Sequence, residues 1–259
     1  MKNGVAMVLS NKVIVVTGGA GGIGYECVKA YISEGAQVAV LDVRREAPER
    51  LREESGKSHL YLHCDVSDEV QVKKAIAHIE QHYGTIDCIH NNAGIAAPAK
   101  PLHETSVDEW QALMQVNVFS IYLTTRYALA ALQRSKGCIL NTSSMVGSIG
   151  QASHAAYTAT KGAVDALTKS MALDYAVYGI RVNAVAPAGV WTPLLREWAA
   201  AQPDTTGIET YLDEIHALGY CPEGDVIADA CVYLVSEKAR FITGCILPVG
   251  GGAELGYRR

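Results

Sequence analysis

A tyrosine and a lysine four residues apart, Tyr157 and Lys161, are the residues of this sequence with the clearest potential for chemistry. Residues at i and i+4 lie on one face of a helix, so both side chains can reach a common ligand. A nearby ammonium favours the phenolate, and moving a tyrosine pKa from ~10 to ~7 takes roughly 4 kcal/mol. Such a tyrosine can accept a proton from an alcohol at neutral pH. Taken alone, however, the pair also fits an ordinary exposed helix.

A glycine-rich turn near the N-terminus indicates a phosphate-bearing cofactor. Residues 13–17 are β-branched and predict a strand buried on both faces, and a helical pattern begins after residue 24. Two spacings fit the glycines between them: G-x-G-x-x-G from position 19 and T-G-x-x-x-G-x-G from position 17. Glycines let the turn approach a pyrophosphate, whose charge is stabilised by the helix N-terminus. We therefore expect a dinucleotide at this turn.

Asp42 follows a second predicted strand, residues 37–41. A carboxylate about twenty residues past the glycines can bind both hydroxyls of the adenine ribose and repel a 2′-phosphate. We therefore expect NAD rather than NADP, although Arg44 and Arg45 partly offset this preference. The alternative is that Asp42 is a solvated turn residue.

Strands and helices alternate through the remaining chain. Further strands are predicted at 60–64, 86–90, 138–142, 180–185 and 245–249, and helices at 68–83, 106–135, 155–178 and 225–235. This alternation predicts a Rossmann-type, doubly wound parallel α/β sheet of about seven strands, covered on both faces. We expect a single domain over residues 1–259, with a mobile substrate lid at about 190–219, where no clean period is seen.

Composition excludes several classes of protein. The net charge of -5 and the lack of a Lys/Arg cluster argue against nucleic-acid binding. The seven cysteines are scattered without a Cys-x-x-Cys, which favours buried thiols in a reducing cytoplasm. No membrane span or signal peptide is expected. The histidine pairs 59/63 and 78/82 are interpreted as solvated, so no metal site is expected, and a hydrolase Gly-x-Ser-x-Gly is absent.

In their order and spacing, these features resemble the short-chain dehydrogenase/reductases, in the single-domain branch of that family. The motifs that carry the resemblance are Thr17–Gly24, Asp42, Asn91–Gly94, Asn117, Ser144, Tyr157 and Lys161. They lie within about residues 9–253 of the chain. The blocks 147–151, 190–194 and 252–257 are similar to the subgroup that contains L-fucose dehydrogenases and type-14 17β-hydroxysteroid dehydrogenase.

The resemblance implies roles for individual residues. Tyr157 would be the general acid/base, Lys161 would lower its pKa and bind the nicotinamide ribose, and Ser144 would hydrogen-bond the reacting oxygen. Asn117 would hold a water that relays the proton to solvent. The implied cofactor-binding residues are Gly18, Gly22, Ile23, Gly24, Asp42, Asp65, Val66, Asn91, Ala93, Gly94, Tyr157, Lys161, Pro187, Val190 and Thr192.

The sequence departs from the family pattern in two places. The family usually has Pro-Gly after the sixth strand, whereas this chain has Pro187 followed by Ala188. The usual Asp before the final Gly-Gly is Gly250 here. The added methyl group could reshape the nicotinamide pocket, and the missing carboxylate puts one C-terminal hydrogen bond in doubt.

The expected substrate is a sugar such as L-fucose, oxidised at the anomeric carbon to a lactone. The substrate-binding residues expected for it are Ser144, Gln151, His154 and Trp191, with Leu195 and Trp198 also above the site. A 17β-hydroxysteroid or another hydrophobic secondary alcohol is the alternative, and a nucleotide-sensing protein without turnover is a more distant one. We also expect a homotetramer paired through the helices at 106–135 and 155–178.

Overall fold

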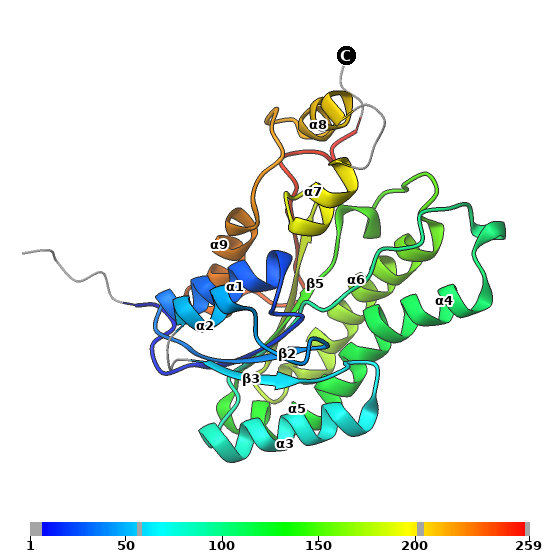
Figure 1. Cartoon of the computed structure of the whole chain (residues 1–259). Coiled ribbons are helices and arrows are strands. Elements are labelled where there is room, and N and C mark those ends of the chain that lie inside the picture. The colour runs from blue at the N-terminus through cyan, green and yellow to red at the C-terminus, as the bar shows by residue number, and fades with distance from the viewer. Residues whose placement is uncertain (1–6, 56–58, 201–204, 257–259) are drawn as a thin grey trace, which may run out of the picture.

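The computed structural model describes residues 7–55, 59–200 and 205–256, which surround one parallel β-sheet (Figure 1). The strands are β1 (Val13–Thr17), β2 (Gln37–Asp42), β3 (His59–His63), β4 (Cys88–Asn91), β5 (Cys138–Thr142), β6 (Arg181–Pro187) and β7 (Ile246–Val249). They form a seven-stranded sheet in the order β3-β2-β1-β4-β5-β6-β7, and every pairing is parallel. The predicted doubly wound fold is confirmed.

Helices cover both faces of the sheet (Figure 1). The α-helices are α1 (Gly22–Ser33), α2 (Glu49–Ser55), α3 (Glu69–Tyr83), α4 (Val107–Met114), α5 (Ser120–Ser135), α6 (Ala155–Ala176), α7 (Pro193–Ala200), α8 (Thr205–Glu214) and α9 (Gly224–Val235). Short 3₁₀ turns lie at η1 (Leu102–Glu104), η3 (Met145–Gly147) and η4 (Glu237–Ala239). Helices α1 and α9 pack in one hydrophobic cluster, and α3, α5 and α6 pack in the other.

The position of β1 inside the sheet, covered on both faces, explains why every residue of the strand is apolar or buried. Ile14 and Val16 point into the cluster under α1 and α9, and Val13 and Val15 point into the opposite cluster. Because successive side chains of a strand point to opposite faces, a strand covered on both sides needs apolar residues at every position. All five residues of β1 are buried.

The predicted helix at 106–135 is interrupted in the structure. Ser106 starts α4 with a capping box that it forms with Glu109, and α5 ends at Ser135. Between them, the turn η2 (Gln115–Phe119) is π-helical and contains the buried Asn117. A π turn inserts one extra residue into a helix, and such turns occur often at functional sites. The sequence pattern gives the helix but not this insertion.

Residues 190–219 were expected to form a mobile substrate lid, and no helix was predicted from their sequence, which shows no clean period. They contain α7 and α8, which lie beyond the carboxyl ends of the central strands (Figure 1). Pro193 occupies the first position of α7, where its missing N–H costs nothing, and Thr192 Oγ1 accepts a hydrogen bond from Leu195 N at 3.2 Å. This Thr-Pro start is a helix signal that the search for apolar periodicity missed.

All seven cysteines are free, and six of them are buried. Cys27 and Cys231 lie with His90 so that their donor atoms are all within 4.8 Å of one another. His90 is engaged by protein groups, since Nδ1 lies 3.1 Å from Tyr31 Oη and Nε2 lies 3.0 Å from Thr142 Oγ1. Burial lowers the pKa of His90 to about 3, so it is neutral. None of the described helices is long and apolar enough to cross a membrane.

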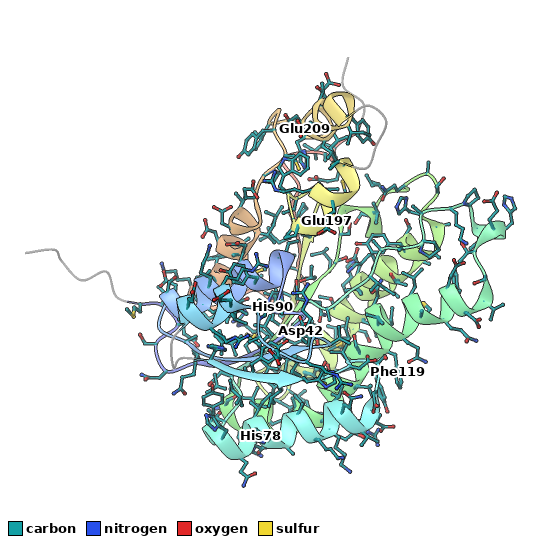
Figure 2. The ribbon with its side chains drawn as sticks, viewed as in Figure 1. Asp42, His78, His90, Phe119, Glu197 and Glu209 are labelled. Atoms are coloured by element: carbon teal, nitrogen blue, oxygen red, sulfur yellow. The ribbon has the colours of Figure 1, made fainter. Side chains whose placement is uncertain are left out.

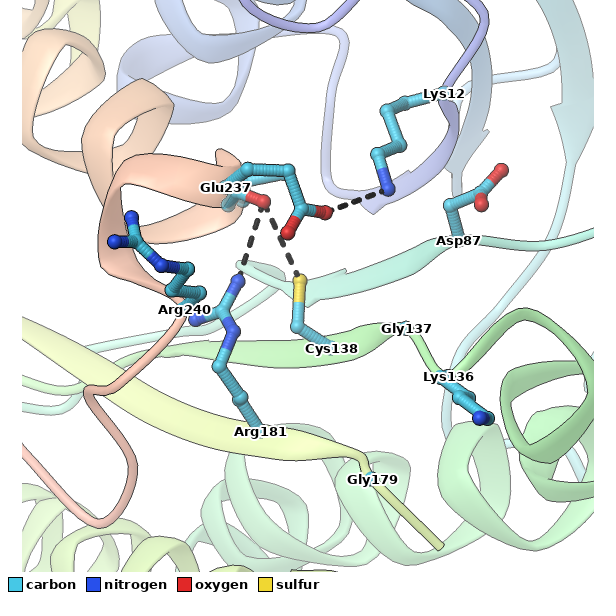
Figure 3. A pocket seen from close by; sticks show the side chains of 10 residues that line it. Lys12, Asp87, Lys136, Gly137, Cys138, Gly179, Arg181, Glu237 and Arg240 are labelled. Carbon is cyan, nitrogen blue, oxygen red and sulfur yellow. Dashed lines mark hydrogen bonds and ion pairs between the residues drawn. The ribbon is translucent and has the colours of Figure 1, made fainter.

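A cavity of about 120 Å³ opens at the amino ends of the strands (Figure 3). Lys12 and Glu237 form an ion pair at 3.0 Å across it, and Arg181 donates to backbone carbonyls at the end of α9. Ligands of open α/β sheets bind at the carboxyl ends of the strands. We therefore assign this cavity to the packing of η4 against the sheet rather than to the functional site.

Candidate functional site

The glycine-rich turn joins β1 to α1 at the point where the strand order changes direction. Gly18 and Gly22 have φ of +64° and +53°, in the left-handed region that favours glycine. A Cβ on Gly24 would lie 2.3 Å from Gly18 O and 2.4 Å from Asn92 Nδ2, so only glycine fits there. Helix α1 begins without a side-chain cap, which leaves its first N–H groups available to an anion.

Asp42 ends β2 beside this turn and is buried; Figure 2 shows it in the interior of the molecule. Its Oδ2 accepts from Ala20 N and its Oδ1 from Arg44 N, both at 3.0 Å. A carboxylate has about four lone-pair positions, so both oxygens can still accept hydrogen bonds from a ribose. Arg44 donates to Ala20 O at 2.6 Å, which brings its guanidinium against Gly21.

The segment after β4 packs directly on the glycine-rich turn. Thr17 Oγ1 accepts hydrogen bonds from Asn92 N and Ala93 N, both at 3.0 Å. A Cβ on Gly18 would lie 2.9 Å from Ala93 Cα, so the two segments are in close contact. The Asn91 side chain points to the face of the sheet that α5 covers, where it donates to Asn141 Oδ1 and accepts from Thr124 Oγ1. Any contact of Asn91 with adenosine would therefore use its backbone.

Asp65 and Val66 lie just beyond β3 at the same edge of the sheet. Asp65 Oδ1 accepts hydrogen bonds from the N–H and the hydroxyl of Ser67, at 2.9 and 2.6 Å. Val66 is buried. Thus the carboxyl ends of β1, β2, β3 and β4 place the residues expected around adenosine along one edge.

Ser144, Tyr157 and Lys161 come together at the carboxyl end of β5. Lys161 Nζ lies 5.6 Å from the centre of the Tyr157 ring and donates to Thr142 O at 2.8 Å. Ser144 follows β5, and its hydroxyl lies 3.4 Å from Pro187 O. The expected placement of the pair on one face of a helix is confirmed, because both side chains project from α6 toward this edge.

Burial has the largest effect on the electrostatics of this group. Burial raises the pKa of Tyr157 above its usual value, and hydrogen bonding with Ser144 opposes this only in part. In the polypeptide without a bound cofactor, burial is therefore the larger effect on the Tyr157 pKa. The lowering expected from Lys161 together with the positive ring of a cofactor stays a prediction. Burial also lowers the pKa of Lys161 to about 8, although the Asp165 carboxylate opposes that shift. At neutral pH Lys161 remains mainly cationic.

Asn117 joins the turn after β4 to α6. Its Oδ1 accepts from Ile95 N, and its Nδ2 donates to Ile95 O, both at 2.8 Å. Nδ2 also donates to Thr160 Oγ1 at 3.0 Å, and that hydroxyl donates to Tyr157 O at 2.7 Å. A Cβ on Gly94 would lie 3.3 Å from Asn117 Oδ1 and 3.7 Å from Lys161 Nζ. Asn117 is therefore close to Lys161, but its side chain is fully engaged by protein groups.

The loop after β6 closes the site on the side opposite to β4. Pro187 and Val190 are buried, and Thr192 faces the turn, since a Cβ on Gly22 would lie 3.4 Å from its methyl carbon. His216 holds this loop from above: Nε2 lies 3.1 Å from Gly189 O, and Nδ1 lies 2.8 Å from Leu212 O. His216 therefore connects the loop at Gly189 to α8, which contains Leu212.

The residues expected to bind substrate do not all lie together. Gln151 is exposed, and His154 is half-buried with its ring centre 6.5 Å from that of Tyr157. Trp191 instead lines a cavity of about 210 Å³ with Tyr25, Arg50 and Glu223, on the α1 and α9 side of the loop. Arg196 lies over its indole ring, 5.0 Å from the centre. The side chain of Trp198 is outside the described residues.

The two departures from the family pattern meet at one point of the structure. A Cβ on Gly250 would lie 3.2 Å from Ala188 Cβ and 2.9 Å from Glu254 Oε2. The carboxylate of Glu254 therefore occupies the space that a larger residue at position 250 would need. Glu254 lies in the block 252–257 that is similar to the L-fucose dehydrogenase subgroup, but the sequence predicted no contact between its side chain and residue 250.

Comparisons with known proteins agree with this geometry. A model of the family described as "Enoyl-(Acyl carrier protein) reductase" matches residues 18–254. L-fucose dehydrogenase from Bos taurus is 42% identical over 250 residues, which cover 96% of this chain and 92% of that protein. The chain belongs to the short-chain dehydrogenase/reductase family. It is an oxidoreductase of that family.

Solved structures of the family superpose over nearly the whole chain. Aldohexose dehydrogenase from Thermoplasma acidophilum, in ligand-free form, has a TM-score of 0.89 at 34% identity and covers 97% of each chain. The 3-ketoacyl-(acyl-carrier-protein) reductase from Brucella melitensis, complexed with NADH, has a TM-score of 0.87 at 30% identity. It covers 95% of this chain and 99% of that chain.

Replacing Lys161 by Met should change how stability depends on pH. The pKa of Lys161 is about 8 in the folded protein, against an ordinary value of 10.5, so between these values the unfolded chain binds more protons. Wild-type stability should therefore rise with pH in this window, by on the order of 3 kcal/mol relative to Lys161→Met. Urea denaturation from pH 7 to pH 10.5 measures this difference.

The exposed Lys238 provides the control, because Lys238→Met removes an ammonium that is already in solvent. Its unfolding free energy should follow that of the wild type across the same pH range. Parallel curves for wild type and Lys161→Met would show that the Lys161 ammonium is not destabilised by burial.

Proposed function

We propose that this protein oxidises a hydroxyl group of an L-fucose-like aldose to the lactone, with NAD as the hydride acceptor. The observation that carries the proposal is the grouping of Ser144, Tyr157 and Lys161 at the sheet edge that also holds the glycine-rich turn. The similarity to L-fucose dehydrogenase, and to the structure of an aldohexose dehydrogenase, supports a sugar substrate.

The residues at the sheet edge fit a dinucleotide. The uncapped N-terminus of α1 and the open backbone at Gly18 and Gly22 suit a pyrophosphate, with Ile23 and Gly24 continuing the same turn. Asp42 would bind the adenine ribose, and Thr192, which faces Gly22, would hold the nicotinamide end together with Pro187 and Val190. When bound, NAD supplies the hydride acceptor and the positive charge of its nicotinamide ring.

The proton of the reacting hydroxyl passes to Tyr157 Oη in this mechanism. Ser144 donates a hydrogen bond to the reacting oxygen and holds it beside the tyrosine. Lys161, fixed by Thr142 O, places a positive charge close to the phenol and favours the phenolate. This stabilisation has to offset the burial that raises the Tyr157 pKa.

Asn117 acts in this scheme through its backbone. Both polar atoms of its side chain bond to Ile95 or Thr160, so a water that relays the proton would be bound by a main-chain carbonyl. The π-helical turn η2 supports this assignment, because i→i+5 bonding alters the usual pairing of helix carbonyls.

NAD is proposed over NADP because the buried Asp42 carboxylate would repel a 2′-phosphate. The guanidinium of Arg44 is already bound to Ala20 O, and this leaves it less free to neutralise such a phosphate. The free and mostly buried cysteines support a reducing compartment such as the cytoplasm.

The substrate would enter between Ser144 and the segment that contains α7 and α8, which we propose as a lid. Gln151 and His154 offer hydrogen bonds to a polyhydroxy ring, whereas Trp191 points to a different cavity and is less suited to this role. A 17β-hydroxysteroid or other hydrophobic alcohol is the second candidate. It would suit two apolar side chains that are not buried, Ile95 after β4 and Leu195 on α7.

We also propose a homotetramer paired through α5 and α6. Leu173 on α6 and Val177, the residue that caps its C-terminus, are 78% and 81% exposed. Phe119, which precedes α5, and Tyr122 in its first turn are 36% and 48% exposed. Contiguous exposed apolar side chains of this kind mark interaction surfaces.

A panel of substrates tests the proposed function. Steady-state kcat/KM should be highest for L-fucose and related aldoses with NAD, and lower for NADP and for 17β-hydroxysteroids. A steroid preference of about tenfold or more, equivalent to ~1.4 kcal/mol in transition-state binding, would overturn the sugar assignment.

Tyr157→Phe separates an enzyme from a nucleotide-sensing protein. The variant keeps the ring but loses the hydroxyl that takes the proton, so kcat should fall by about 100-fold or more. The NAD dissociation constant should change by less than about twofold. Tyr178→Phe, at an exposed tyrosine just beyond α6, should keep the wild-type kcat. Unchanged turnover in Tyr157→Phe would contradict the mechanism.

Leu173→Glu combined with Val177→Glu should dissociate the tetramer, because two charges would be buried in the interface. Multi-angle light scattering at micromolar concentration gives the mass of the wild type and the variant. Val70→Glu, at another exposed apolar residue on α3, should leave the wild-type mass unchanged. A monomeric wild type would contradict the proposed assembly.

A further inference from the structure

Glu254 carries a buried carboxylate oxygen for which no described residue provides a hydrogen bond. Among the described residues, the buried side-chain N or O atoms without a partner are Glu254 Oε2 and two threonine hydroxyls. A threonine hydroxyl is neutral and can rotate toward a partner. A carboxylate oxygen that is buried without a donor loses its hydration, and no hydrogen bond offsets that free-energy cost. Such a group in a folded protein calls for an explanation.

This oxygen lies beside the loop that follows β6, next to Ala188. Oε2 lies 2.9 Å from the point where a Cβ on Gly250 would be, and Ala188 Cβ lies 3.2 Å from the same point. Ala188 directly follows Pro187, whose carbonyl is 3.4 Å from Ser144 Oγ. The carboxylate is thus separated from Ser144 by the short stretch of backbone at 187–188.

The turn that carries Glu254 is held in place from several sides. Ala253 N donates to Gly250 O at 3.0 Å, and Leu218 N donates to Gly251 O at 3.1 Å. The ring of His216 packs against Gly251 and also binds Gly189 O. These contacts connect the turn both to the chain after α8 and to the loop after β6, so the carboxylate has a defined place beside that loop.

We propose that Glu254 is a substrate-binding residue, whose Oε2 accepts a hydrogen bond from a ring hydroxyl of a polyhydroxy substrate. This inference rests on the proposed function and deepens it, because it names a residue that selects hydroxyl-rich substrates. A hydrogen bond from a hydroxyl to a carboxylate is about twice as strong as one between neutral groups. A steroid or other hydrophobic alcohol offers no second hydroxyl here and leaves the carboxylate buried without a partner, which disfavours its binding.

The amide of the nicotinamide ring is the competing donor, since the loop at 187–190 is the one proposed to hold it. The two assignments predict different kinetics. Loss of a substrate contact lowers kcat/KM for hydroxyl-rich substrates only, whereas loss of a cofactor contact weakens NAD binding and lowers the rate with every alcohol.

Glu254→Gln tests the proposal, because it removes the charge with little change of shape. We expect kcat/KM for L-fucose to fall on the order of 30- to 100-fold, with the NAD dissociation constant within about twofold of wild type. With cyclohexanol, which has no second hydroxyl, the rate should not fall. Gly250→Ala should give the same pattern, because its Cβ displaces the carboxylate without removing it.

L-fucose derivatives that each lack one ring hydroxyl identify the bonded group. One derivative should be a poor substrate for the wild type and lose nothing further in Glu254→Gln, which is the signature of a coupled pair in a double-mutant cycle. Glu53→Gln, an exposed glutamate on α2, is the control for the substitution and should behave as wild type with every substrate. Thermal unfolding of each variant with NAD bound verifies that the fold is intact.

The outcomes separate this inference from the proposed function. If the wild type oxidises no aldose, the proposed function fails, and the inference fails with it before any variant is compared. If the wild type oxidises L-fucose but no derivative shows coupling to Glu254, only the inference fails. A fivefold or greater rise in the NAD dissociation constant, or an equal loss with cyclohexanol and L-fucose, would also overturn it.

Discussion

The candidate site at the carboxyl ends of the strands depends on one ammonium group that is buried inside the fold. Lys161 is only 5% exposed, and a cation taken from water needs nearby acceptors to remain charged. Thr142 O supplies a direct hydrogen bond, and Asp165 supplies the charge that opposes the loss of the proton. Asp165 lies one turn further along α6, whereas Thr142 is the last residue of β5, so α6 must pack against this strand before the site exists.

The polar groups around this ammonium are connected to one another by hydrogen bonds. His90 bonds to the hydroxyl of Thr142, whose carbonyl holds Lys161, and Ser143 bonds to Asp165 at 2.5 Å. Asn117 connects the segment after β4 to Thr160, one residue before Lys161. The site is therefore a continuation of the core at the end of the strands, and hydrogen bonds among buried side chains hold its geometry.

Much of this arrangement could be predicted from single residues and their spacing. Apolar strands such as residues 13–17, the glycines and the spacing of Tyr157 from Lys161 are local features with few alternatives. The π turn at Gln115–Phe119 and the helices α7 and α8 were not predicted, because tertiary packing decides them. The spacing of the residues also predicted which groups lie near Tyr157, but not that the tyrosine is buried, and this burial raises its pKa in the polypeptide without a cofactor. Glu254 depends on a contact with Gly250 that no periodic pattern encodes.

The π turn sets a strict limit on the length of the helix that contains it. The turn holds one residue more than an α-helical turn would, so deleting one residue from 115–119 would close it into a regular helix. Asn117 would then be displaced from the segment after β4, and its hydrogen bonds with Ile95 would be lost. A deletion of the kind that surface loops tolerate would here separate two parts of the site.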